Sequence, residues 1–397
     1  MSSSDIVITG IGAVTAGAVG RVAHWDLLQN GRVTTSENDY SLKLFRPDSH
    51  VKDRRYLRSC SQADGIGLAA LSGLMTDSNF DPKYYSPERV GIYTGESPPN
   101  PQDHSGHFEA LEAARDEHGH ISEKVFGQAS RSARPVTLLL GLSNNVLCYG
   151  SLMWDARGPN SNYTASVLSA HLAVINAARR LQRGALDLAI AGGCSDSTEE
   201  FRKATLIATN IAAGYAKGTA VADGAAFITL ERRKAALARG SRILASYISS
   251  AYSCDGLGPA RFDRDGNALY DCIVRALSAA AVNPAEIGLI FSGSSGLPDL
   301  DLMETQVLGR VFAGAATPPA LADTSRVLGG LMEAGGMLDL GLVSEFFTCG
   351  VVPPAVRPHV NRGQFSNLIT PERPFALALR CSTSGEYSCV IVKGELN

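Results

Sequence analysis

The chain has 397 residues, of which 45% are hydrophobic and 19% are charged, and its formal net charge is -3. This length allows a large buried core and predicts two or three domains. The small net charge argues against binding to nucleic acid or to an anionic membrane surface. No run of about 18 apolar residues predicts a membrane-spanning helix. The opening residues MSSS do not begin a signal peptide.

The eight cysteines include no C-x-x-C pair, and Cys148, Cys272 and Cys389 lie inside apolar segments. Paired or metal-bound thiols usually show a recognisable spacing. We therefore interpret these cysteines as reduced core thiols of a cytoplasmic protein.

The chain opens with a predicted strand at 5–9, a glycine-rich stretch and a helix near 19–30. Gly10 and Gly12 follow a strand, as in a dinucleotide-binding fingerprint. The third glycine position of that fingerprint holds Thr15, however, and no acidic residue ends a second strand about 20 residues further on. A dinucleotide site is therefore not expected.

A helix at 63–75 and a strand at 89–94 precede the least regular part of the chain, 96–134. Four histidines lie close together there, and imidazoles alone make a metal site conceivable; these are His104, His107, His118 and His120. A solvated helix over 107–120 with its flanking loop is favoured, because no cysteine or complete ligand set accompanies them. Pro135 then opens a second apolar helix, 135–149.

Residues 158–193 are the stretch around which the chain is organised. They predict a strand at 160–165, a helix at 166–183 and an apolar strand ending at Gly193. The first turns of this helix are apolar or small on nearly every side, which is typical of a buried helix.

The rest of the chain continues the alternation of helices and mostly apolar strands, which predicts an α/β protein with buried sheets. The predicted helices are 197–207, a charged helix near 230–240, 265–281, 300–313 and 328–347. The predicted strands are 225–230, 242–250, 287–292, 319–322, 374–380 and 388–393. The order of elements in the first half recurs in the second.

The segment Gly158–Gly193, with the opening V-T-G-x-G-x-V-T pattern, resembles the β-ketoacyl synthases. This resemblance implies the thiolase fold, with duplicated α/β halves in a five-layered αβαβα arrangement, here divided at 1–240 and 241–397. In that family a cysteine nucleophile sits at the start of the buried helix, where helix N–H groups favour a thiolate. A gapless match places Val167 at that position, with Ser166 beside it.

The two histidines of the family are also absent at the matching positions. Gly293 stands at the first, after strand 287–292, and Gly330 stands at the second. Asp301 and Glu304 match the family pattern, whereas Ser325 replaces its lysine. The family's terminal glycine-rich loop keeps one glycine in 382–387. His171, one turn into the buried helix, is interpreted as a hydrogen-bonded core residue rather than a displaced base.

The resemblance, with nucleophile and histidines lost together, predicts a catalytically inactive chain-length factor of a type II polyketide synthase. Its partners would be an active ketosynthase subunit and an acyl carrier protein, with no cofactor, metal, nucleic acid or membrane. In many chain-length factors glutamine replaces the cysteine. Val167 departs from that, which suggests a divergent lineage such as one serving polyene-like chains. Two alternatives stay open: an acyltransferase or ketosynthase using Ser166, and a homodimeric protein that binds acyl chains.

The resemblance also predicts which residues form the interface between the two subunits. The strand at 160–165 would pair with a partner's strand across a two-fold axis. The helix Val136–Tyr149 would line the acyl tunnel, unless its apolar residues are ordinary core and product length is set within 96–134. The predicted interface and tunnel residues are Leu138, Gly141, Leu142, Val146, Asn160, Asn162, Tyr163 and Thr164.

Overall fold

Five strands of the first half form one part of a continuous sheet. The computed structural model describes residues 5–31, 40–97, 105–132, 139–140, 142–208, 221–293, 296–358 and 365–395. In this part the strand order is β4-β3-β5-β6-β1. The strands are β1 (Ile6–Thr15), β3 (Val90–Gly95), β4 (Ser161–Tyr163), β5 (Leu188–Asp196) and β6 (Asp223–Arg232), with the short β2 (Ala18–Val19) paired to β1.

The second half repeats this order as β9-β8-β10-β11-β7. Its strands are β7 (Ala245–Cys254), β8 (Ile287–Phe291), β9 (Ala320–Ala322), β10 (Phe375–Cys381) and β11 (Glu386–Gly394). In each half the first two neighbouring pairs are parallel and the last two are antiparallel. The repeat that the order of elements suggested is therefore a repeat of topology.

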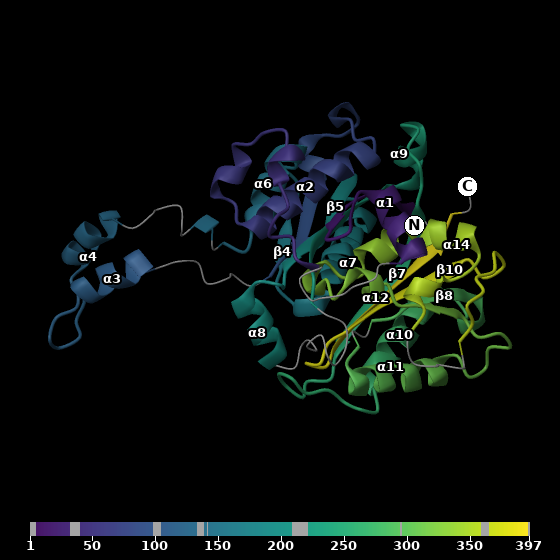
Figure 1. Ribbon diagram of the computed structural model, residues 1–397. Coiled ribbons are helices and arrows are strands. Elements are labelled where there is room, and N and C mark those ends of the chain that lie inside the picture. The colour runs from purple at the N-terminus through teal and green to yellow at the C-terminus, as the bar shows by residue number, and fades with distance from the viewer. Residues whose placement is uncertain are drawn as a thin grey trace.

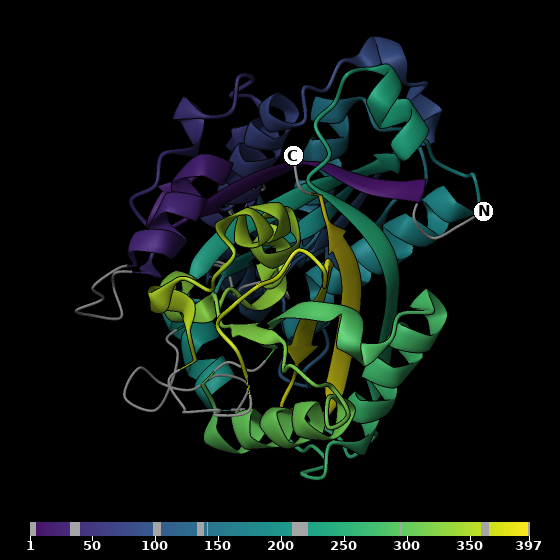
Figure 2. The same cartoon turned by 90° about the vertical axis from the view of Figure 1, so that its right-hand side faces the viewer.

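The two halves stack as layers with helices between and outside them (Figures 1 and 2). Strands β1 and β7 join them through three antiparallel residue pairs. The helices α2 and α6 cover the outer face of the first half, and α10 and α11 cover that of the second. Their bounds are α2 Gln62–Asp77, α6 Asn145–Trp154, α10 Asn267–Ala280 and α11 Pro298–Val311. This is the five-layered α/β arrangement of the thiolase fold.

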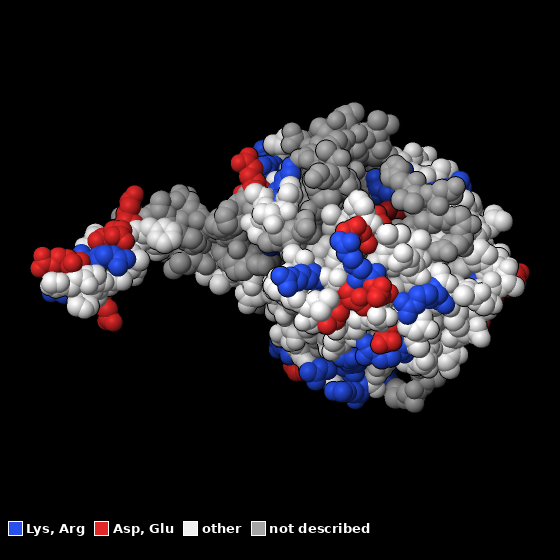
Figure 3. Space-filling model, turned by 90° about the horizontal axis from the view of Figure 1, so that it is seen from below, with Lys and Arg blue, Asp and Glu red and all other residues white. Residues whose placement is uncertain are grey.

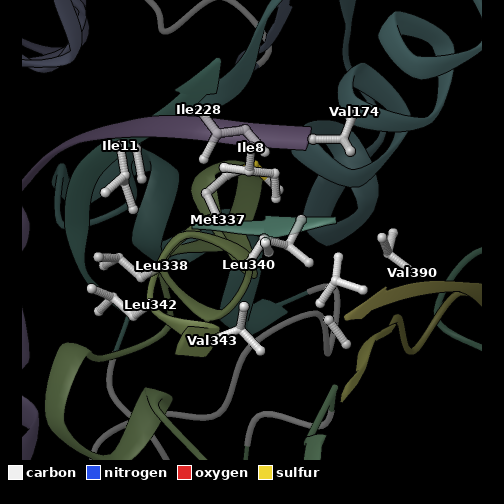
Figure 4. Close-up of a cluster of buried hydrophobic side chains, with 14 of the residues drawn as sticks. Ile8, Ile11, Val174, Ile228, Met337, Leu338, Leu340, Leu342, Val343 and Val390 are labelled. Atoms are coloured by element: carbon white, nitrogen blue, oxygen red, sulfur yellow. The ribbon is translucent and has the colours of Figure 1, made fainter. Parts of the chain in front are cut away.

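The middle layer holds the buried helix of each half. Helix α7 contacts strands of both halves of the sheet, while α13 packs on β1 and β6. Figure 4 shows side chains from β1, β6, α7, α13, α14 and β11 meeting in this layer. The middle helices are α7 (Ser169–Gln182), α12 (Ser325–Leu328), α13 (Met337–Gly341) and α14 (Val343–Cys349). The expected catalytic positions therefore lie next to the ends of elements in this middle layer, in the centre of the molecule.

The remaining elements flank or connect these layers. The other helices of the body are α1 (Arg21–Asn30), α8 (Glu200–Ala208) and α9 (Arg233–Ala238). Short 3-10 turns are η3 (Pro47–Ser49), η4 (Tyr56–Ser59), η5 (Pro82–Tyr84), η6 (Pro87–Arg89), η7 (Ser130–Ser132), η8 (Ser166–Leu168), η10 (Pro284–Glu286), η11 (Met332–Ala334) and η12 (Pro354–Val356).

Several predicted elements were wrong in extent. Strand β1 continues through Gly10 and Gly12 to Thr15 instead of ending at residue 9. A Cβ on Gly12 would lie 2.1 Å from the Ala70 carbonyl oxygen, so these glycines allow helix α2 to pack closely rather than forming a turn. The predicted helix 328–347 is divided into η11, α13 and α14, because Gly329 and Gly336 adopt positive φ angles.

The predicted helix Val136–Tyr149 also differs, since α6 begins only at Asn145 and extends to Trp154. Residues 139–140 are helical, but Leu138 and Gly141 lie outside the described residues. Buried hydrogen bonds at Asn145, described below, account for the later start of the helix.

Residues 105–132 form a helical hairpin that projects from the body (Figure 1). We call these residues the arm; it consists of α3 (Ser105–Ala113), a turn, α4 (Glu123–Ala129) and η7. Only Ala110 and Ala114 of the arm are buried, whereas Phe108 is 65% exposed. The helix predicted over 107–120 ends earlier than expected, at Ala113. The chain reverses direction after it, and Arg115 forms an antiparallel bridge with Ile121.

Charged side chains of both signs are interspersed over the face of the body shown in Figure 3. The arm carries five acidic and three basic residues: Glu109, Glu112, Asp116, Glu117 and Glu123 against Arg115, Lys124 and Arg131. Among the described helices, none is long and apolar enough to cross a membrane.

Candidate functional site

The start of the buried helix is held in a strained turn. Strand β4 ends at Tyr163, and Ser166, the first residue of η8, adopts a left-handed conformation with φ 49° shortly before α7. The Ser169 hydroxyl closes this turn, because it accepts the Ala165 N–H at 2.9 Å and donates to the Ser166 carbonyl at 2.8 Å. A non-glycine residue in this region costs on the order of 1–3 kcal/mol and is often found at functional sites.

Ser166 precedes Val167 in the sequence and carries a hydroxyl next to the position expected to hold the nucleophile. Its Oγ is buried and has no hydrogen-bond partner within the described structure. A serine becomes a nucleophile when a base accepts its proton. No base is hydrogen-bonded to Ser166 here.

Val167 is 2% exposed and lies in a small apolar cluster. Its neighbours in the cluster are Leu168, Leu206, Val221 and Met332. Met332 belongs to η11, the turn in the second half that follows Gly330, and it too has a positive φ of 34°. The position of the expected cysteine is therefore packed with the chain's own apolar side chains.

Gly293 leaves no space for an imidazole. Its N–H donates to the Glu304 carboxylate at 2.6 Å, and its carbonyl accepts the Cys381 N–H at 3.1 Å. A Cβ on Gly293 would lie 2.8 Å from the Arg380 backbone nitrogen and 2.7 Å from the Leu379 carbonyl carbon. Since both contacts are to backbone, a larger residue at this position requires the strands to move.

Gly330 is buried, and its carbonyl accepts the Ala222 N–H at 3.1 Å. Three residues further on, the fully buried Glu333 forms an ion pair with Arg202 of α8 and accepts a 3.1 Å hydrogen bond from the Ser97 hydroxyl. The ion pair and the hydrogen bond connect the turn after Gly330 to α8 and to the segment after β3. The second histidine position therefore belongs to a rigid, fully packed segment.

His171 is a core residue, as the sequence indicated. Its Nδ1 lies 3.0 Å from the Ser388 hydroxyl. Burial, followed by the nearby charge of Arg380, lowers the pKa of His171 to about 3. A neutral imidazole with one nitrogen engaged by Ser388 is not placed as a base for Ser166 or Val167.

The predicted interface strand is an open edge of the sheet. Strand β4 has a neighbour, β3, on one side only, and Asn160 and Thr164 beside it are exposed. At the opposite end of the sheet, β9 is covered by the chain itself through a bridge between Ala320 and Ser366. Among the described residues, the edge at β4 therefore stays without a partner strand.

Asn162 and Tyr163 fix this edge to the segment before α6. The Thr94 hydroxyl donates to the Asn162 side-chain oxygen at 3.1 Å, and Asn162 donates to the Ser143 carbonyl at 2.5 Å. The Tyr163 carbonyl accepts the Glu96 N–H at 3.0 Å. Leu142 is 47% exposed, whereas Val146 is fully buried in the outer core of the first half.

Sequence reasoning missed a pair of buried acids next to this edge. Glu96 accepts the Leu147 N–H at 3.3 Å and the Thr94 hydroxyl at 2.7 Å, which holds the first turn of α6. Asn145 donates to Asp64 at 3.0 Å. Burial raises the pKa of Glu96 to about 8, and burial also raises that of Asp64. A lone Glu after a strand carries no sequence signal of this role.

The described residues contain no group of three or more His, Cys, Asp or Glu that could hold a metal ion. His118 and His120 are exposed on the arm, and His104 lies outside the described residues, as do Ser295 and His359. All eight cysteines are free thiols.

The fold is the thiolase fold, and the three positions at which the sequence predicts the family's catalytic residues hold Val167, Gly293 and Gly330. Family models for the N-terminal domain (residues 3–236) and the C-terminal domain (residues 244–358) of β-ketoacyl synthase both match. The chain belongs to the β-ketoacyl synthase family.

Several relatives in this family are named as polyketide ketosynthases. The chain is 24% identical over 378 residues to actinorhodin polyketide putative beta-ketoacyl synthase 1 of Streptomyces coelicolor, covering 88% of this chain and 78% of the relative. It is 23% identical over 396 residues to the tetracenomycin ketoacyl synthase beta subunit of Streptomyces glaucescens, covering 89% and 88%.

Solved structures share the fold. The ishigamide ketosynthase/chain length factor has a TM-score of 0.78 and 17% identity, with 99% of each chain covered. A type II ketosynthase complex with its acyl-carrier protein, AntDE:AntF, has a TM-score of 0.76 and 17% identity, covering 99% of this chain and 100% of that one.

Proposed function

We propose that the protein is a non-catalytic chain-length factor, which pairs with an active ketosynthase during polyketide chain elongation on an acyl carrier protein. The observation that carries this proposal concerns the three predicted catalytic positions. They hold Val167, Gly293 and Gly330, which carry no catalytic group and are packed against other parts of the chain. Removing one member of a catalytic unit already lowers the rate by orders of magnitude. The tetracenomycin relative that is named as a beta subunit supports a two-chain assembly.

The open edge at β4 supports the pairing. An unpaired strand edge is a site for association, and permanent interfaces bury on the order of 2,000 Å² or more. The partner's strand would pair with β4, and Leu142 beside it would face the shared acyl tunnel. The free cysteines support a reducing, cytoplasmic setting. The division into halves at residues 240 and 241 stays a prediction.

Intact-mass spectrometry tests the absence of catalysis. The purified chain, incubated with an acyl carrier protein loaded with an acyl group, should gain no mass. An active ketosynthase treated in the same way is the positive control. A stoichiometric acyl adduct would contradict the proposal.

One observation favours a second candidate function, acyl transfer from Ser166. Its left-handed backbone and its buried, unpartnered Oγ are features found at nucleophile turns. An adduct that disappears in the Ser166→Ala variant, while Ser169→Ala retains it, would establish this alternative.

Purification distinguishes these two candidate functions from a third, a homodimeric acyl-chain-binding protein. Co-expression with the active ketosynthase should give a 1:1 complex under the first proposal only. The isolated chain should then self-associate or be poorly soluble. A stable, soluble homodimer that ignores the ketosynthase would favour the third candidate, and a well-behaved monomer by light scattering would contradict an obligate dimer.

A further inference from the structure

Arg380 is a buried cation without a partner. It lies near the end of β10, directly against Gly293, and is 7% exposed. Its Nε–H has no hydrogen-bond partner, and no carboxylate of the described residues forms an ion pair with its guanidinium group. A buried charge is normally paired, because its desolvation otherwise costs several kcal/mol.

Asp339 does not supply the missing partner. One oxygen of its carboxyl group, which is buried in the middle layer, accepts the Thr324 hydroxyl at 2.7 Å. Burial raises the pKa of Asp339, although the field of Arg380 opposes this shift. The two groups therefore act on each other through space without a direct contact.

A second donor points to the same place. His171 is fully buried, and its Nε2 has no hydrogen-bond partner in the described structure. When the Ser388 hydroxyl donates to Nδ1, the proton of the neutral ring is on Nε2. The imidazole then presents a donor for which the described protein provides no acceptor.

Two glycines bring these donors together. A Cβ on Gly336 would lie 2.4 Å from His171 Nε2 and 3.2 Å from Arg380 Cδ. A Cβ on Gly335 would lie 2.6 Å from the Arg380 Nη2 atom. Both side chains thus pack against the same backbone turn at Gly335 and Gly336.

We propose that Arg380 and His171 bind a small monovalent anion, either chloride or a carboxylate, beside Gly336. An anion accepts hydrogen bonds from both donors and also neutralises the guanidinium charge. Water would satisfy the donors but would leave the buried charge uncompensated. This site is separate from the proposed chain-length role, and either proposal can fail without the other.

Bromide provides a direct test, because it replaces chloride and scatters anomalously. Crystals of the full chain, in whichever assembly it purifies, are soaked in sodium bromide. We expect an anomalous peak within hydrogen-bond distance of the Arg380 guanidinium. Co-soaking with acetate or malonate distinguishes the sources, since a carboxylate site loses the bromide peak and a halide site retains it.

Thermal unfolding gives a second measurement. Raising sodium chloride to about 100 times the dissociation constant should raise the Tm of the wild type by about 3 °C more than that of Arg380→Met. Arg310→Met is the matched control, because Arg310 is exposed over the Tyr270 ring. Its salt response should equal that of the wild type.

Two results together would overturn the site: no bromide peak in wild-type crystals, and parallel salt responses of the wild type and Arg380→Met. If Arg380→Met does not fold, the wild-type bromide map decides alone. A peak at the guanidinium supports the site, and a map with bromide only elsewhere on the surface contradicts it.

Discussion

Val167 lies at the position where the sequence predicts the family's nucleophile, and its apolar surroundings oppose a thiolate. Burial raises the pKa of Cys194, Cys381 and Cys389 well above the ordinary value of a thiol. A thiol introduced at Val167 would be enclosed by Leu168, Leu206, Val221 and Met332 in the same way. The chemistry cannot return through a single substitution.

We therefore expect Val167→Cys to form no acyl-enzyme and to react slowly with iodoacetamide. The histidines remain absent, and the buried thiol stays protonated. Peptide mass spectrometry provides its own control, because Cys148, Cys254 and Cys349 are exposed and should be labelled first. Labelling at position 167 as fast as at these three would show that the pocket is open.

Glu96 should make the protein less stable as the pH rises. Its pKa is about 8 in the folded protein, against about 4.5 in the unfolded chain. A raised pKa of an acid contributes stability below pH 4.5 that is lost as the pH rises to 8, at about 1.4 kcal/mol per pH unit. Glu96→Gln keeps an oxygen that can accept from Thr94 and Leu147 but does not titrate.

Calorimetry at pH 5, 6, 7 and 8 measures this effect. The Tm of Glu96→Gln should fall less than that of the wild type over this range and should exceed it at pH 8. Glu88→Gln is the control, because Glu88 is exposed and its pKa is lowered by the Ser86 hydroxyl. Parallel Tm curves for Glu96→Gln and the wild type would refute the role of Glu96.

At the scale of elements, the segment from Leu139 to Val146 is divided between two environments. Val146 is buried against α2, and its side chain lies 2.8 Å from a Cβ placed on Gly67. Leu139 and Leu142 are each 47% exposed, next to the open strand β4. The apolar residues of the predicted tunnel helix therefore do not all belong to one core.

Leu142→Trp should shorten the polyketide made by the co-expressed complex, because the larger ring would narrow the proposed tunnel. Product mass spectrometry measures the chain length. Leu237→Trp is the control, since Leu237 is 60% exposed on α9, away from β4 (Figure 1). Unchanged products from an intact Leu142→Trp complex would move the length-setting residues to another element, with residues 96–134 next to be tested.

The alternation of strands and helices, and hence the layered α/β fold, could be predicted because each apolar run is compact and bounded by polar turns. The ends of several elements could not be predicted. In the sequence, Gly10 and Gly12 suggest a turn. In the structure they lie within β1 and allow helix α2 to pack closely against the strand. The start of α6 depends on Glu96 and Asp64, which are distant in sequence.

The candidate site was predictable only in part. Local motifs predict that Val167, Gly293 and Gly330 stand at the family's catalytic positions, and this assignment stays a prediction. The left-handed Ser166, the Met332 contact and the isolated Arg380 arise from packing between the two halves, for which a single sequence has no local signal.

At the scale of the whole molecule, the arm stands away from a densely packed body. Its two short helices bury only Ala110 and Ala114 between them, which is too little to hold helices of nine and seven residues by themselves. Such a segment opens at a low free energy.

Limited trypsin digestion of the isolated chain should therefore cut first within 105–132, at Arg115, Lys124 or Arg131. In the complex with a ketosynthase the same bonds should be cut at least ten times more slowly if the partner covers the arm. Exposed arginines of the body, such as Arg264 and Arg310, serve as internal controls. Equal cleavage of the arm in both samples would place it outside the interface.

The open strand β4 is only three residues long. Each backbone hydrogen bond adds about 1 kcal/mol, so strand pairing alone gives little affinity and no discrimination between one thiolase-fold chain and another. Selectivity must then come from side chains around the strand, such as Tyr163 and Arg179, whose guanidinium lies 5.5 Å from the Tyr252 ring centroid. Choice of partner can therefore drift in evolution, or be redesigned, without disturbing the sheet that supports it.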